Sequence, residues 1–105
     1  MAFDIKKLQD TQKSRLEAKR EIFHLPEWVD GENDGNITIK PVTYSVISQY
    51  LKSKATVGEH QAGVYLIMNG VEGFNTIEHS RFLNGEATGT ILKIVKEINR
   101  VSGIE

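Results

Sequence analysis

The hydrophobic positions near the two ends of the chain follow helical spacing, but at very different density. Over residues 4–22 the apolar side chains are sparse and form one thin stripe among polar residues, and Asp4 is a suitable N-cap. Over residues 86–101 they recur every three or four positions and share one face. Gly103 follows where a left-handed residue commonly ends a helix. We therefore predict a long polar helix over 4–22 and an amphipathic core helix over 86–101. The expected core face of the latter contains Ile91, Ile94, Val95, Ile98 and Val101.

Two short runs with strand-like composition, residues 22–25 and 37–40, flank a turn-rich and acidic segment. Asp-Gly occurs twice in that segment, at Asp30-Gly31 and Asp34-Gly35, and this dipeptide is the strongest short signal for a hairpin turn. We predict a β-hairpin across residues 22–40 with a long acidic loop.

Helical patterns occupy most of the remainder. Thr43 is a suitable N-cap for a helix that runs to about residue 54. Residues 62–71 fit either a strand, by composition, or a helix, by spacing; no partner strand is evident, which favours the helix. Asn75 and Glu78 form a capping-box pattern for a short helix that ends before Gly85. The expected fold is mainly α, in the α+β class: a polar N-terminal helix, one hairpin, and a helical part over 43–102. In the helix after Thr43, the face that we expect to pack against the core contains Tyr44, Val46, Ile47, Tyr50 and Leu51.

The composition fits one domain over residues 1–105 and does not indicate a particular class of binding partner. Thirteen basic and fourteen acidic side chains give a net charge of −1, so no overall field draws the chain to nucleic acid or anionic lipid. The absence of cysteine excludes disulfides and thiol chemistry. The longest apolar run, residues 62–68, is far too short to span a membrane, and the N-terminus lacks a secretion-signal pattern. We therefore expect a cytoplasmic protein without membrane contact.

No reactive or metal-binding motif in the sequence is complete. Asp30, Glu32 and Asp34 imitate the start of a calcium loop, but Pro41 stands where the twelfth position requires a glutamate. The histidines are not at a chelating spacing, and neither a nucleophile elbow nor a phosphate-binding loop occurs. We expect no metal, no cofactor and no enzymatic activity; an enzyme would require a cleft with perturbed ionisable groups. The three histidines are His24, His60 and His79.

Three segments carry a resemblance to a known family: FHLPEWVDG at 23–31, ITIKP at 37–41 and INRVSGI at 98–104. The first two segments follow a polar first helix and are followed by several further helices, and the third segment lies close to the end of the chain. In this layout the chain resembles, over nearly its whole length, the tail assembly chaperones of long-tailed bacteriophages. The resemblance implies a non-enzymatic protein of the host cytoplasm, absent from the mature virion, that binds the tape measure protein and associates with itself. It also implies a frameshift-extended product that recruits the tail tube protein. A chain end at Glu105 open to solvent would accommodate that extension.

Binding a helical partner would require apolar or aromatic anchors. The candidates are Leu8, Leu16, Trp28, Tyr44, Tyr50 and Phe82. Leu8 and Leu16, with the apolar face of the last helix, are also the expected self-association contacts. The alternative function is a small DNA-binding helical regulator of phage origin, which six basic against three acidic side chains in residues 4–20 favour and the overall charge disfavours. Salt-dependent binding to duplex DNA distinguishes the two hypotheses.

Overall fold

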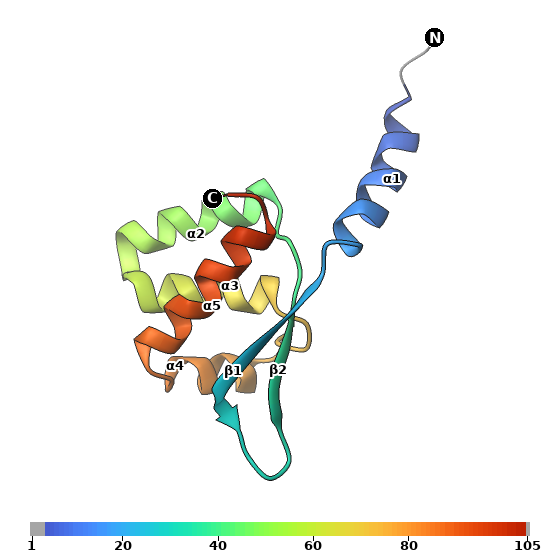
Figure 1. The fold of residues 1–105 in the computed structure, drawn as a ribbon. Helices are drawn as coiled ribbons and strands as arrows, with labels where there is room; N and C mark the ends of the chain where they lie inside the picture. Colours follow the sequence, from blue (N-terminus) through green and yellow to red (C-terminus); the bar gives the residue numbers. More distant parts are fainter. Residues whose placement is uncertain (1–3, 105) are drawn as a thin grey trace.

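Five helices and one antiparallel hairpin make up residues 4–104, the part of the chain that the computed structural model describes (Figure 1). In chain order the elements are α1 (Ile5–Glu17), β1 (Glu21–Val29), β2 (Asp34–Ile39), α2 (Tyr44–Val57), α3 (Glu59–Gly70), α4 (Ile77–Asn84) and α5 (Thr88–Val101). The prediction of a mainly helical α+β fold with one hairpin is confirmed. The predicted open chain end concerns Glu105, which lies outside the described residues.

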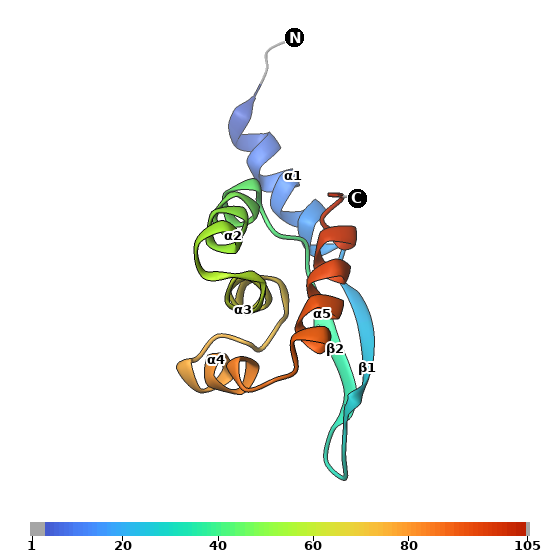
Figure 2. The same cartoon turned by 90° about the vertical axis from the view of Figure 1, so that its left-hand side faces the viewer.

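Helix α3 is the centre of the packing. It contacts α2, α4 and α5. Figure 2 shows α2, α3 and α4 stacked on one side of α5 and the hairpin on the other side. Gly63 and Gly70 of α3 face α5: a Cβ atom at Gly63 would lie 2.6 Å from Ile91 Cγ2, and one at Gly70 would lie 2.9 Å from Ile98 Cδ1. The two glycines therefore let α3 and α5 approach closely. The predicted core face of α5 is confirmed, since all five of its residues are buried. The expectation that this face is also a self-association contact is wrong, because packing against the rest of the chain leaves it no exposed surface.

The segment with ambiguous composition is helical, as its spacing favoured. Residues 62–70 belong to α3, and several successive positions of this helix are buried because it is surrounded on more than one side. From 62 to 70 no residue of this helix is exposed, which is why the composition of the segment resembled that of a buried strand. Val71, just past its end, forms an isolated antiparallel bridge with Ile39.

The predicted hairpin is present, but its strands are longer than predicted and its register begins one residue earlier on each strand. Glu21 pairs with Ile39 and Phe23 with Ile37, and a register irregularity follows between His24 and Val29 before the strands close at the loop. Pro26 lies inside this irregularity, where its missing N–H costs no ladder bond. β1 therefore continues to Val29, through residues that the sequence assigned to the turn.

The predicted first helix, 4–22, is too long. Asp4 caps it as expected, since its side chain accepts a hydrogen bond from the Lys7 amide at 3.2 Å, but the helix ends at Glu17. Ile22 belongs to β1 and pairs with Thr38. The thin apolar stripe buries no residue of α1, so nothing holds residues 18–22 in the helix against strand pairing with β2.

The boundaries of the other helices also differ from the predictions. α2 runs to Val57, and of its expected core face Tyr44 and Leu51 are exposed, because only α3 covers this helix extensively. The capping box of α4 lies one residue later than predicted, with Thr76 as the cap and His79 in place of the glutamate. α5 begins at Thr88 rather than 86.

The end of α5 matches the prediction at Gly103. This glycine has φ 79°, and its amide donates to the Arg100 carbonyl while the Ile104 amide donates to the Asn99 carbonyl at 2.9 Å. These two bonds form a Schellman motif. The side chain of Ile104 is half exposed, so it adds little to the core.

Candidate partner-binding site

A pocket of about 440 Å³ opens between the hairpin and α4. Trp28 of β1, Phe74 of the α3–α4 connection and Phe82 of α4 bring three aromatic rings to it. The Trp28 ring centroid lies 5.3 Å from that of Phe82, edge to face, and 5.9 Å from that of Phe74. Phe82 is 50% exposed, whereas Trp28 Nε1 is buried without a hydrogen-bond partner among the described residues. We call this site the aromatic pocket.

The hairpin loop forms one wall of the aromatic pocket and is held by its own side chains. The Asp30 carboxylate accepts hydrogen bonds from the amides of Glu32 and Asn33, each at 2.8 Å, and these bonds, with those from the Asn33 side chain, lower the pKa of Asp30. Gly35 is required for closure: its φ is 77°, and a Cβ atom there would collide with the Leu25 carbonyl oxygen. The loop therefore has a defined conformation.

Glu27 ties this end of the hairpin to α5. Its carboxylate accepts hydrogen bonds from Lys93 Nζ at 2.8 Å and from the Thr90 hydroxyl at 3.1 Å. The bond from Lys93 is the main cause that lowers the pKa of Glu27. Both bonds are accepted by the same oxygen, Glu27 Oε2, so the contact joins one point of β1 to one turn of α5.

The electrostatic character of the aromatic pocket is acidic. Four carboxylates line it, and none of the described residues that line it is a lysine or an arginine. These carboxylates belong to Glu27, Asp30, Asp34 and Glu86. Aromatic rings beside carboxylates are suited to a cationic, partly apolar side chain, because the ring faces and the carboxylates both attract positive charge.

A second candidate surface is the outer side of α2. Tyr44, Ser48, Leu51 and Ala55 are spaced by four, three and four residues and so lie in one row along the helix. Tyr44 is 84% exposed and Leu51 is also exposed, while the neighbouring Tyr50 points into the core. We call this row the α2 stripe. Its spacing is the one that a helix presents to a partner helix in a coiled coil.

The third candidate surface is α1, which we call the arm. It contains no buried residue, and both Ile5 and Leu8 are about half exposed. Figure 1 shows it standing away from the body of the molecule. Its connection to the body is fixed by ion pairs, Arg20 with Glu72 at 2.6 Å and, at the start of β1, Glu21 with Arg100 at 3.0 Å.

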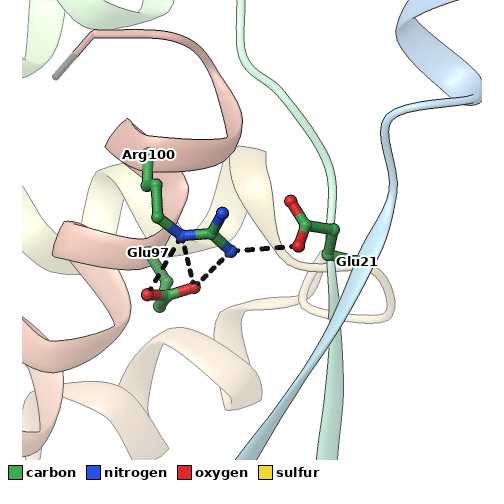
Figure 3. A network of polar contacts seen from close by, with 3 residues as sticks. All are labelled: Glu21, Glu97 and Arg100. Carbon is green, nitrogen blue, oxygen red and sulfur yellow. Dashed lines mark hydrogen bonds and ion pairs between the residues drawn. The ribbon is translucent and has the colours of Figure 1, made fainter.

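Arg100 joins α5 to the base of the arm. Its guanidinium donates to Glu97 on the same helix and to Glu21 of β1, an arrangement drawn in Figure 3. The two carboxylates raise the pKa of Arg100, and the hydrogen bonds to Glu97 contribute most. Arg100 and Glu21 are half exposed and Glu97 is partly buried, so the network joins the start of β1 to α5 at the surface and adds little to stability.

The six anchors predicted from sequence are distributed over these surfaces unevenly. The fold brings Trp28 and Phe82 together in the aromatic pocket; Leu8 and Leu16 lie on the arm, and Tyr44 lies on the α2 stripe. Tyr50 is only 6% exposed and belongs to the core, so it is unavailable to a partner. Sequence reasoning missed Phe74, Glu86 and Leu51. For Leu51, the seven-residue interval from Tyr44 was the available signal.

The histidines each make local contacts. His24 Nδ1 lies 2.8 Å from Asn36 Oδ1 across the hairpin, and His60 contacts the Leu83 carbonyl at 3.0 Å and the Thr88 hydroxyl at 2.9 Å. His79 accepts from the amides of Asn75 and Thr76. Within residues 4–104, no group of three or more side chains of the metal-ligating types is gathered, and no helix has the length and apolarity to cross a membrane.

Comparison with known proteins adds no relative: no family matches the chain, and no curated protein or solved structure is significantly similar to it. The three surfaces therefore stand on their geometry alone.

Proposed function

We propose that this chain is a non-enzymatic tail assembly chaperone of a long-tailed bacteriophage. It binds the tape measure protein in the host cytoplasm, associates with itself, and is absent from the mature virion. The sequence segments at 23–31, 37–41 and 98–104 support the family. The α2 stripe is the single observation that carries the binding role, because Tyr44, Leu51 and Ala55 of this row are exposed on a helix that is otherwise anchored in the core.

The α2 stripe suits a helical partner. Tyr44 and Leu51 offer large side chains one heptad apart, and Ser48 and Ala55 between and beyond them allow a second helix to approach closely. A flat row of this kind offers no enclosure to a small ligand, which binds in a concave site. An apolar face of a tape measure helix laid along it would be shielded from other copies until the tail tube encloses it.

The proposal includes a longer product that recruits the tail tube protein through residues added after this domain. Its support here is local: the Schellman bonds close α5 before Ile104, and the side chain of Ile104 is half exposed. Residues continuing from this point would leave the packing of α5 on α3 undisturbed. A tethered second segment would raise the local concentration of the tube protein to the order of millimolar.

Co-expression tests the function. The tape measure protein encoded by the same phage should be largely insoluble when expressed alone and should become soluble when this chain is present, and the two should co-purify. The effect should persist after ATP is depleted from the lysate, because a binding partner that shields apolar surface needs no energy source. Equal solubility of the tape measure protein with and without this chain would reject the proposal.

The second candidate function, a DNA-binding regulator, is favoured by the cationic side chains of the arm, which are exposed to solvent. It predicts that the chain binds duplex DNA with an affinity that falls steeply between low and high salt. Fluorescence anisotropy with a labelled duplex measures this directly. Tight, salt-dependent binding together with no effect on the tape measure protein would favour DNA binding over the chaperone function.

A further inference from the structure

The charges of the chain are separated between the arm and the body. The arm together with its cap and the residues that join it to β1, residues 4–20, carries six cationic and three acidic side chains, a net charge of +3. The remaining residues carry seven cationic and eleven acidic ones, a net charge of −4. The overall charge of −1 conceals this division. A molecule with oppositely charged ends attracts other copies of itself in a head-to-tail orientation.

The arm also carries an apolar stripe between cations. At 100° per residue, Ile5, Leu8 and Leu16 lie on one side of α1, and Lys13 and Arg15 lie on the two flanks of that side. Ile5 and Leu8 are about half exposed and Leu16 is only partly covered, so none of the three apolar side chains is buried within its own molecule. The stripe is therefore a cationic, apolar surface without a partner.

The aromatic pocket has the complementary properties. Phe82 is half exposed at its edge, Trp28 and Phe74 form its apolar wall, and Asp34 and Glu86 are among the carboxylates around it. In Figures 1 and 2 the arm and the tip of the hairpin lie at opposite ends of the molecule. The arm therefore points away from the pocket of its own chain, and Arg20 and Glu21 form ion pairs with the body where the arm begins.

We propose that the arm of one copy docks in the aromatic pocket of the next. The leucines of α1 contact the rings, and the flanking lysine and arginine side chains meet the ring faces and carboxylates. The two surfaces differ, so the contact is heterologous, and repeating it produces a ring or an open filament. This proposal specifies the contact by which copies of the chain associate, and it rests on the proposed function, which includes self-association. The α2 stripe stays free for the tape measure protein.

Two variants, each with one damaged surface, test the geometry. The arm variant is Leu8→Asp with Leu16→Asp, and the pocket variant is Phe82→Lys, which places a cation at a half-exposed position. Light scattering at high micromolar concentration should find wild type well above the monomer mass of 11.8 kDa and each variant at that mass. An equimolar mixture of the variants should reach twice the monomer mass, because one intact arm meets one intact pocket and growth then stops.

The controls make each outcome decisive. Ser14→Asp adds charge to the opposite side of α1 and should associate as wild type does. If circular dichroism shows that Phe82→Lys has lost helix, Glu86→Lys replaces it as the pocket variant. A monomeric wild type, a folded pocket variant that still oligomerises, or a mixture that stays monomeric would each overturn the proposal. No tape measure protein is present, so these results are independent of the co-expression test.

Discussion

At the scale of single residues, close packing and hydrogen bonding determine which positions tolerate no substitution. Gly63 is the clearest case, because a Cβ atom there would lie 2.6 Å from Ile91 Cγ2 and 3.2 Å from Val95 Cγ2. Gly89 has the same residue type in a helix and nothing within 4 Å of the corresponding position. The pair separates the effect of packing from that of helix propensity.

We therefore expect Gly63→Ala to lower the free energy of unfolding by about 1–3 kcal/mol, since overpacking outweighs the better helix propensity of alanine. Gly89→Ala should leave stability unchanged or raise it by up to about 1 kcal/mol. Chemical denaturation measures both. A Gly63→Ala variant as stable as Gly89→Ala would show that α3 and α5 are not in such close contact.

Glu27 gives a prediction for the dependence of stability on pH. Its pKa is lowered in the folded state, chiefly by the hydrogen bond from Lys93, so its contribution is fully present above its ordinary value of 4.5 and is lost as the pH falls below that value. The melting temperature of wild type should exceed that of Glu27→Gln at neutral pH, and the gap should narrow in acid. In a Lys93→Gln background the gap should be small throughout. A gap that widened on acidification would contradict this assignment.

At the scale of elements, the sequence predicted what depends on local periodicity and missed what depends on neighbours. The five-residue apolar face of α5 and the presence of a hairpin between the runs at 22–25 and 37–40 followed from spacing and turn residues, whereas its register did not. The early end of α1 did not, because strand pairing with β2 competes for residues past 20. The contact of Trp28 with Phe82, 54 positions apart, depends on where α4 packs and left no local signal.

The arm yields a prediction at this scale. Because α1 buries no residue, a chain without residues 1–17 should keep its core, and its free energy of unfolding should change by no more than about 0.5 kcal/mol under monomeric conditions. As a matched comparison, Leu66→Ala in the buried part of α3 should cost about 2–5 kcal/mol. Thermal denaturation at low concentration tests both. A large loss of stability in the truncated chain would mean that the arm belongs to the core.

At the scale of the whole molecule, the arm makes the protein elongated. The radius of gyration is 15.3 Å, whereas about 13 Å is typical of a compact domain of 100 residues. The extended shape places the arm and the tip of the hairpin at opposite ends of the molecule, and α2 belongs to the body, apart from both. Such an arrangement suits a protein whose copies line up along a partner, and the proposed chaperone function depends on that partner surface.

The soluble fraction of the tape measure protein, measured with variants of the α2 stripe, tests this claim most directly. Wild type and the control Ser45→Asp with Gln49→Asp, which adds two charges to exposed positions of α2 off the stripe, should keep the tape measure protein soluble to the same extent. Tyr44→Asp with Leu51→Asp adds the same charges within the stripe and should abolish the effect, while circular dichroism and the melting temperature stay near those of wild type. Equal solubility with all three chains would contradict the account.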